Sequence, residues 1–535
     1  MRRAHDLAEP GSRMGLPLAT DVTVAVTSPI LMSTDGFQRW CRIIALLLGG
    51  LSGGFPVSAG PGNPALPDAL RVVLAETRPL EHARGPRLPL LILPISHTLR
   101  GVPQVQTEEA LKELNLRGIG YSVSWSPADP DASIAEALRI ARCQRKLGMH
   151  VIADATACLH SFFDGADALL HVDDSGAVFA ETSFGGKLGC PFTLEPRVPV
   201  IRERIDRFVR AYRDAGLPLD LVFADWEIDG PIEWNDAWAN SKRCRRCRDN
   251  VVALSDFRAF QRRLREIRSA LQRRAFSEPV LAQFPRALVG NYGVYPNDGY
   301  RYWYDYFERE GPPGAPVRMD HHARYREWVQ EFGPCGYTLA MPVIYTWYPT
   351  FHWYDFSTGD YRWIYNLLLN ASNAGRHTPS QVPILPFVHW TTTAPPPNPD
   401  PAVRQLDARA YQELLWHLLL RGHDTFFLWC LPEELRSEVR LLHPVYAESL
   451  AHREFLDHGV PITFEVPTIP GSVVSGLRWK DQVLVRRTDF SGTTSDLDFA
   501  LPEGGRVRVS AVGGLQVLPV ASTRPAVVLP DGLRQ

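Results

Sequence analysis

The chain lacks an excess of charge of either sign. Its 535 residues contain 57 lysines and arginines against 59 aspartates and glutamates, which gives a formal net charge of -2. Proteins that bind nucleic acid through its phosphates carry a clear excess of basic residues. The composition therefore argues against a nucleic-acid partner, while the 45% hydrophobic content predicts a globular chain with a large core.

Long apolar runs are lacking too. After the first sixty residues no run approaches the roughly 20 residues that a bilayer-spanning helix needs, so no stable membrane span is expected. The run Ile43–Leu51 follows Arg39 and Arg42 and leads to small residues at Ala59, which is typical of a secretory signal peptide. We expect this signal from Met32 to about Ala59, and hence a secreted or periplasmic protein. A membrane anchor is the alternative interpretation.

Cysteine is sparse, with eight residues in the chain and seven once Cys41 leaves with the signal. An odd number argues against a fully paired disulfide framework. Cys244 and Cys247 form the one close pair, and a zinc site would need two further ligands that no matching second pair supplies. A local disulfide between them is the favoured interpretation. No His-x-His or His-Glu-x-x-His spacing is present, so neither a metal nor another cofactor is predicted.

Short apolar runs alternate with longer amphipathic stretches from residue 88 onward, which is typical of an α/β fold. Eight such runs predict a (β/α) barrel of the TIM type over residues 61–458. A doubly wound open sheet is the alternative, but the glycine-rich turn expected after its first strand is missing. The eight predicted strands are Leu88–Ile95, Gly118–Trp125, His150–Ala157, Leu219–Trp226, Ala287–Val294, Gly336–Tyr345, Val382–Trp390 and Asp424–Cys430.

After about residue 459 the pattern changes to short alternating segments divided by glycine, proline and aspartate. Such segments predict a small C-terminal β-sandwich over residues 459–535. Residues 1–60 form a third part, an N-terminal extension with the signal peptide. Within the barrel, residues 158–197 follow the third strand and are too long for a plain connection. They are expected at the C-terminal end of the strands, where barrel active sites are built.

The fourth predicted strand ends in two carboxylates, Asp225 and Glu227, on either side of Trp226. Side chains at positions i and i+2 of a strand lie on one face, so both acids are expected to project into the barrel mouth while Trp226 points away. Close like charges raise the pKa of one partner, which suits a general acid for glycoside cleavage. We predict Asp225 and Glu227 as catalytic residues. A helix cap or a cation site is the alternative.

A second acid on another strand is harder to assign. Two-carboxylate glycosidases place their acids across the mouth of the site, yet the seventh strand ends in Pro386-Phe-Val-His-Trp-Thr-Thr-Thr without an acid. The acids that follow other strands are Asp154, Asp298, Asp355 and Glu433. A substrate-assisted route needs no second nucleophile, because the acetamido oxygen of an N-acetylhexosamine attacks its own anomeric carbon. In that route Glu227 protonates the leaving oxygen and Asp225 orients the acetamido group.

Aromatic residues are concentrated in one part of the chain. Residues 292–365 contain 22 Phe, Trp and Tyr in 74 positions, against 10% in the whole sequence. Sugar rings stack their flat C–H faces on such side chains. Aromatic residues at strand ends are the better candidates, while many of the others are expected in the core. The predicted substrate-binding residues are Tyr292, Tyr345, Trp390 and Trp429, together with Asp298.

Five short motifs follow one another along residues 220–430: Val222-Phe-Ala-Asp-Trp-Glu, Gly290-Asn-Tyr-Gly-Val-Tyr-Pro, Met341-Pro-Val-Ile-Tyr, Ile384-Leu-Pro-Phe-Val and Gly422-His-Asp-Thr-Phe-Phe-Leu-Trp. In this order they resemble motifs of the hyaluronidases, glycoside hydrolase family 56. By this resemblance Glu227 would be the proton donor, Asp225 the acid that positions the acetamido group, and Tyr292, Tyr345 and Trp429 the pocket residues.

The sequence departs from that family at Asn297-Asp298, where the family has an acid or tyrosine followed by cysteine, and after Glu227, where Ile-Asp-Gly-Pro replaces a Trp-Arg-Pro run. Hyaluronan is polyanionic, and a chain of net charge -2 shows no overall basicity toward it. The basic segment Lys242–Arg248 is interpreted as a solvated surface. These departures concern the polymer substrate more than the pair of acids.

The sequence thus predicts an exported glycoside hydrolase that acts on a β-linked polysaccharide or oligosaccharide. The resemblance implies an N-acetylhexosamine-containing substrate and a retaining, substrate-assisted mechanism. Two alternatives stay open: a glycosidase that pairs Glu227 with an unidentified second acid, and a non-catalytic carbohydrate-binding surface protein. Nothing in the sequence indicates an oligomeric state.

Overall fold

The computed structural model describes residues 66–159, 166–183, 186–226, 237–298, 331–352, 359–393, 395, 398–511 and 513–521. The predicted N-terminal extension with its signal from Met32 to Ala59 lies outside these residues, and so does Glu227. None of the helices in the described part combines the length and apolar character that a bilayer crossing requires.

Eight parallel strands form two four-stranded sheets. The first has the order β2 (Ser122–Ser124), β3 (Ile152–Asp154), β8 (Leu221–Ala224) and β9 (Leu288–Asn291). The second has the order β1 (Leu91–Ile92), β12 (Phe427–Leu428), β11 (Phe387–Thr393) and β10 (Val343–Trp347). Each strand falls within or overlaps one of the eight predicted apolar runs, so the predicted α/β class with parallel strands is confirmed.

Backbone hydrogen bonds connect the two sheets at both ends. Between β1 and β2, the Leu90 amide donates to Gly118 O at 3.0 Å and Gly120 donates back to Leu90 O at 2.9 Å. Beyond β9, the amides of Thr338 and Leu339 both donate to Val289 O, at 2.9 and 3.1 Å. The strand order within and between the sheets therefore follows the order of the strands along the chain.

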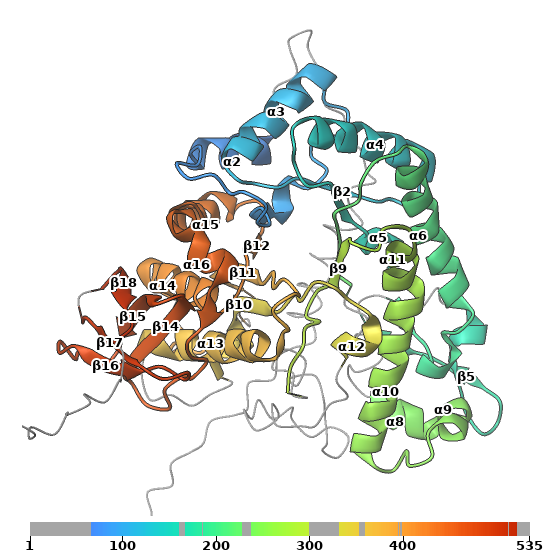
Figure 1. Ribbon diagram of the computed structural model, residues 1–535. Coiled ribbons are helices and arrows are strands. Elements are labelled where there is room, and N and C mark those ends of the chain that lie inside the picture. Colours follow the sequence, from blue (N-terminus) through green and yellow to red (C-terminus); the bar gives the residue numbers. More distant parts are fainter. Residues whose placement is uncertain are drawn as a thin grey trace, which may run out of the picture.

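Helices alternate with the strands and cover their outer side (Figure 1). Their spacing explains this: in α6, buried residues recur every three or four positions at Val198, Ile201, Ile205, Phe208 and Tyr212. Asp129 and Asp407 cap α4 and α14 by accepting amide hydrogen bonds. The helices are α2 (Asp68–Glu76), α3 (Gln104–Leu116), α4 (Pro130–Lys146), α5 (Thr156–Leu159), α6 (Arg197–Asp214), α8 (Ala237–Arg243), α9 (Arg245–Asn250), α10 (Phe257–Gln272), α11 (Glu278–Gln283), α12 (Phe332–Cys335), α13 (Gly359–His377), α14 (Ala408–Leu419), α15 (Leu435–Ser449) and α16 (Arg453–His458).

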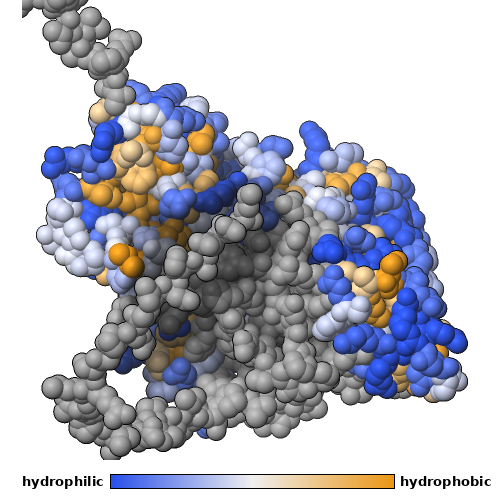
Figure 2. All heavy atoms as spheres, turned by 90° about the horizontal axis from the view of Figure 1, so that it is seen from below, coloured by the Kyte–Doolittle hydropathy of each residue, from blue (hydrophilic) through white to orange (hydrophobic). Residues whose placement is uncertain are grey.

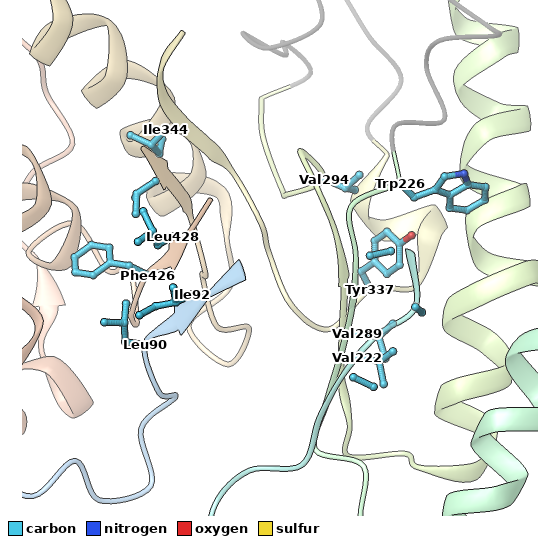
Figure 3. Packing of buried hydrophobic residues seen from close by; sticks show 14 of the residues in the cluster. Leu90, Ile92, Val222, Trp226, Val289, Val294, Tyr337, Ile344, Phe426 and Leu428 are labelled. Atoms are coloured by element: carbon cyan, nitrogen blue, oxygen red, sulfur yellow. The ribbon is translucent and has the colours of Figure 1, made fainter. Parts of the chain in front are cut away.

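The two faces of each strand belong to different hydrophobic cores. On β8, Val222 packs in the outer core between strands and helices, and Figure 3 shows it there with Val289 and Trp226. Phe223 belongs instead to an inner core. Its ring contacts that of Phe427 on β12 edge to face, with centroids 4.8 Å apart. The inner core thus joins strands of both sheets, which face each other across it.

Residues after 459 form antiparallel strands. A four-stranded sheet has the order β13 (Val460–Pro461), β14 (Ser472–Trp479), β15 (Gln482–Asp489) and β18 (Leu515–Pro519), and a hairpin pairs β16 (Leu497–Ala500) with β17 (Arg506–Val509). Residues of the sheet and of the hairpin share a small hydrophobic core of their own. The predicted boundary at residue 459 stays a prediction.

A buried polar contact joins this sheet to the helices before it. Arg421, which follows α14, is fully buried and donates from Nε to Ser475 Oγ on β14 at 2.8 Å. Its other nitrogens donate to Ser372 Oγ and to Glu465 O, the latter at 2.9 Å. His417 reaches the same Ser475 at 2.9 Å. A buried guanidinium is tolerated because its donors find acceptors.

Substituting Arg421 tests how strongly this contact holds the C-terminal strands. Arg421→Ala leaves several buried acceptors without a donor and is expected to cost about 3 kcal/mol or more of unfolding free energy. Urea denaturation of the full chain measures this loss of unfolding free energy. Arg409→Ala, an exposed arginine on α14, is the matched control. Equal midpoints for the two variants would show that the contact contributes nothing.

Candidate active site

The C-terminal end of β8 presents Asp225 toward the inner side of the sheets. Leu221 and Phe223 lie in the inner core, and the alternation of a strand places Asp225 on their face. Trp226 points the other way, into the outer core, as Figure 3 shows. Its backbone is fixed by Asn291, whose amide side chain accepts from Trp226 N at 2.9 Å and donates to Trp226 O at 3.0 Å.

Asp225 is held in an environment that disfavours its charge. Its backbone amide donates to Thr156 Oγ1 at 2.8 Å, while its own Oδ1 is buried and has no hydrogen-bond partner in the part of the chain described. Burial raises the pKa of Asp225 to about 7, and the nearby charge of Asp154 adds to this rise. Asp225 therefore exchanges its proton near neutral pH, which is a property of functional carboxyl groups.

Asp154 lies at the end of the neighbouring strand β3 and is well supported. Ser124 Oγ donates to its Oδ2 at 2.9 Å, and the Thr156 amide donates to its Oδ1 at 2.9 Å. Ser124 also lies 2.8 Å from Nδ1 of His97. Burial lowers the pKa of His97, although the charge of Asp154 opposes this. The ends of adjacent strands thus bring together an imidazole, a hydroxyl and two carboxyl groups.

The sequence predicts these polar groups only in part. Asp154 is one of the acids that follow predicted strands, whereas His97 matches no metal-binding spacing in the sequence. Ser124 was missed. Its position at the end of a predicted strand was the available signal, because the ends of parallel strands meet on one side of a sheet. His97 further has a left-handed backbone, with φ of 47°, which is uncommon for a residue other than glycine.

The C-terminal ends of the strands β9 to β12 carry aromatic side chains. Tyr345 at β10 has its ring centroid 6.2 Å from that of Tyr292 and 5.5 Å from that of Trp429. His389 on β11 stands edge-on to both Tyr345 and Trp429, at 5.8 and 5.3 Å. All four side chains are buried. The structure therefore brings together Tyr292, Tyr345 and Trp429, three of the predicted substrate-binding residues, although they come from three different strands.

Two acids contact the His389 imidazole. Its Nε2 lies 3.0 Å from Glu434 and 3.4 Å from Glu438. Glu438 also accepts from the amides of Trp390 and Thr391, the latter at 2.7 Å. Burial raises the pKa of Glu438, and the nearby His389 opposes this rise. These contacts orient the imidazole so that its other face meets the aromatic residues.

The remaining predicted site residues lie elsewhere. The Trp390 indole donates from Nε1 to Leu406 O at 2.7 Å and packs against the outer core. Asp298 is exposed and accepts a hydrogen bond from Asn373 at 3.2 Å. Glu227, the predicted proton donor, lies outside the described residues.

Comparisons with known proteins give distant matches in structure only. No protein-family profile and no curated protein sequence matches the chain. Among solved structures, the chain is similar to α-L-fucosidase isoenzyme 2 from Paenibacillus thiaminolyticus, with a TM-score of 0.40 and 14% identity over 72% of this chain and 53% of the fucosidase. The chain thus spans about half the length of that protein.

Two further solved structures are similar at the same level. An α-amylase from Anoxybacillus gives a TM-score of 0.37 and 11% identity over 79% of this chain and 91% of the amylase. An α-galactosidase from Geobacillus stearothermophilus gives a TM-score of 0.38 and 12% identity over 85% of this chain and 58% of the galactosidase. None of these three is described as a hyaluronidase, so the resemblance to that family stays a prediction. At such TM-scores the activity has to be argued from the residues themselves.

The pKa of Asp225 can be tested without any substrate. An aspartate whose pKa is about 7 in the folded state and about 4 in the unfolded state lowers the free energy of unfolding above pH 7. This destabilisation disappears as the pH falls toward 4, because the group is then protonated in both states. Asp225→Asn removes that dependence. The stability of the variant relative to the natural protein should therefore grow by about 3 to 4 kcal/mol between pH 4 and pH 8.

Urea denaturation across this pH range measures the difference. The exposed Asp498→Asn provides the matched control, because an exposed carboxyl group loses little hydration on folding. A pH dependence for Asp225→Asn that equals that of the control would show that Asp225 titrates normally.

Proposed function

We propose that the protein is a glycoside hydrolase that cleaves a β-linked glycan at the C-terminal end of its parallel strands. The observation that carries this proposal is Asp225, an inward-facing carboxyl group with a buried, unpartnered oxygen within the described residues and a pKa of about 7. It lies at the same end of the strands as the aromatic residues Tyr292, Tyr345 and Trp429. Acid chemistry and sugar-stacking surfaces are the two requirements of glycoside cleavage.

The fold we propose is a closed (β/α) barrel followed by a C-terminal β-sandwich. The hydrogen bonds between Leu90 and residues 118–120, and those that Val289 accepts, support closure because they link the outer strands of the two sheets. The inner core supports it as well, since a barrel interior is filled by side chains from all its strands. Active sites of such barrels lie at the C-terminal ends of the strands, where Asp225 is found.

We propose a substrate-assisted mechanism with retention for an N-acetylhexosamine residue. The acetamido oxygen bonds to the anomeric carbon while the glycosidic C–O bond breaks, and Glu227 gives its proton to the leaving oxygen. Asp225, as a carboxylate, accepts the acetamido N–H and stabilises the positive charge that develops there. Water then attacks the anomeric carbon, the bond between that carbon and the acetamido oxygen breaks, and the water gives up a proton to Glu227, which restores the enzyme and the acetamido group.

The free oxygen of Asp225 supports this role. A carboxylate that orients an acetamido group needs an acceptor atom that is not already engaged, and Oδ1 meets this requirement within the described residues. Asp154 differs, because both of its oxygens accept hydrogen bonds from Ser124 and Thr156. The pair therefore divides into a supporting acid, Asp154, and a reactive one, Asp225.

The aromatic cluster supports a sugar substrate. Tyr345 and Trp429 pack against each other with ring planes 31° apart and centroids 5.5 Å apart, and both are buried on the inner face of the sheets. Their rings are of the kind on which sugar rings stack. A glycosidase that uses two enzyme carboxylates without substrate assistance is the second mechanism, and a carbohydrate-binding protein without turnover is the second function.

A panel of glycans tests the proposal. The panel contains hyaluronan, chondroitin, chitin oligomers and β-glucans without acetamido groups, each incubated with the natural protein, Glu227→Gln, Asp225→Asn and the control Glu503→Gln, an exposed glutamate. Loss of a general acid lowers the turnover number by about 100-fold to 10,000-fold. We expect cleavage of the acetamido-containing glycans only, lost in the first two variants and retained in the control.

Other outcomes separate the alternatives. Cleavage of a glucan without acetamido groups would overturn substrate assistance and favour two enzyme carboxylates. Binding without any cleavage by the natural protein would favour the carbohydrate-binding function. Full activity of Glu227→Gln would refute the assignment of the proton donor.

The pH profile tests the role of Asp225. Because the proposed mechanism needs Asp225 as a carboxylate, kcat/KM should rise with pH through about pH 7. Asp154→Asn removes a charge that raises the pKa of Asp225, so the rise should move to lower pH, while burial, the larger cause, remains. Rates measured from pH 4 to pH 9 decide this. A rate that falls through pH 7 and shifts in the same variant would make Asp225 the acid instead.

A further inference from the structure

Two loops on the C-terminal side of the strands meet away from the candidate active site. The loop after β3 contains a hairpin of β4 (His171–Val172) and β5 (Val178–Phe179) and continues to Cys190. The loop after β8 contains α8 and α9, with Cys244 directly before α9 and Cys247 inside it. Segments of the chain that are far apart in sequence thus bring three thiols and one imidazole to one place.

The four side chains converge closely. One ligand atom each of His171, Cys190, Cys244 and Cys247 lies within 4.8 Å of every other, and all four residues are buried. Cys190 Sγ and Cys247 Sγ are 3.5 Å apart, and Cys247 Sγ is 3.8 Å from Nδ1 of His171. In a tetrahedral zinc site with Zn–S bonds of about 2.3 Å, the sulfur atoms are about 3.8 Å apart.

We propose that His171, Cys190, Cys244 and Cys247 bind a structural zinc ion. Three sulfurs and one imidazole nitrogen form one of the common ligand sets of structural zinc, and four protein ligands leave no open position for a reacting water. The Cys-x-x-Cys spacing of Cys244 and Cys247 at the start of a helix is typical of such sites. Among the described residues this is the one group of potential ligands with such convergence.

The surroundings supply a hydrogen-bond donor to one of the sulfurs. The backbone amide of Val172 donates to Cys244 Sγ at 3.5 Å. Three thiolates and one zinc ion would leave one net negative charge. Lys242, Arg243, Arg246 and Arg248 lie beside the site in the sequence and supply positive charge to balance it.

The basic segment also braces the loop that carries His171. Arg246 donates to Leu170 O at 2.6 Å and to Ala168 O at 3.1 Å. The His171 ring stacks on the ring of Phe179, with centroids 5.1 Å apart. Arg243 lies over the same Phe179 ring, 4.5 Å from its centroid. Residues that orient a ligand in this way commonly accompany metal sites. Figure 2 shows the end of the molecule with α8 and α9, on the right as in Figure 1, where the described surface is largely hydrophilic.

The structure corrects the expected local disulfide. The seven cysteines in the described residues are all free thiols, Cys244 and Cys247 included. A disulfide would need a sulfur distance of about 2.05 Å, and a bond between any two of the three thiols would leave the third and His171 without a shared partner. No second pair of ligands is visible in the sequence because His171 and Cys190 come singly from another loop.

A zinc ion here would fasten the loop after β3 to the loop after β8. The second of these loops follows directly from Asp225, so the metal would hold in place the chain that continues from the candidate catalytic strand. This role does not depend on the proposed glycosidase activity, because the site is closed and distinct from the strand ends. Structural zinc contributes directly to folding free energy.

The test uses the full chain purified without a metal-binding tag from zinc-supplemented cells. Mass spectrometry of the metal content should find about one zinc per chain, lost in Cys247→Ser and kept in Cys143→Ser, a buried cysteine on α4 outside the cluster. X-ray absorption at the zinc edge should give three sulfurs at about 2.3 Å and one nitrogen at about 2.0 Å. His171→Cys should still bind zinc but show four sulfurs.

Three results would overturn the proposal. The first is a natural protein that carries no zinc and gains none when zinc is added to the reduced chain. The second is full zinc content in Cys247→Ser. The third is an absorption spectrum with oxygen and nitrogen ligands only, which decides the question even where the cysteine variant fails to fold.

Discussion

The packing of aromatic rings between the two parallel sheets is the contact on which the other features depend. Phe387 and Phe427 on neighbouring strands of one sheet stack with centroids 4.5 Å apart, and Phe223 of the other sheet meets Phe427 edge to face. Because these rings occupy the inner face of their strands, the residues two positions later also face inward. By this rule Asp225 faces inward like Phe223, and His389 faces inward like Phe387. The packing of the phenylalanines in the inner core thus sets the direction of the polar side chains that follow toward the C-terminal ends of the strands.

The site that results has two unlike halves. Strands β2, β3 and β8 contribute Ser124, Asp154 and Asp225, whereas β10, β11 and β12 lead to Tyr345, His389 and Trp429. The aromatic residues are buried, and so is Oδ1 of Asp225, so that the charge of Asp154 adds to the effect of burial on the pKa of Asp225. Under the proposed function, one half would hold the sugar face and the other would perform the proton transfer.

Much of this could be predicted from periodicity alone. Alternation predicted the opposite directions of Asp225 and Trp226, and strand ends predicted the meeting of Tyr292, Tyr345 and Trp429. Trp390 shows where the criterion is too coarse. It also stands near a strand end, but His389 beside it occupies the inner face, so Trp390 faces the helices and donates to Leu406. Counting positions along the strand from a residue known to face inward distinguishes inner from outer side chains, because every second residue lies on the same face.

The loops follow a different constraint from the strands. Hairpin β4–β5 pairs only two residues per strand, and Val178 is exposed, so the hairpin itself contributes few backbone hydrogen bonds and little apolar burial. Four ligands from separate segments have no common spacing in the sequence, and only the fold places them together. A metal suits this situation, because a few strong bonds to one ion replace the many weak contacts of a hydrophobic core. The strands would then be ordered by packing and the loops around them by coordination.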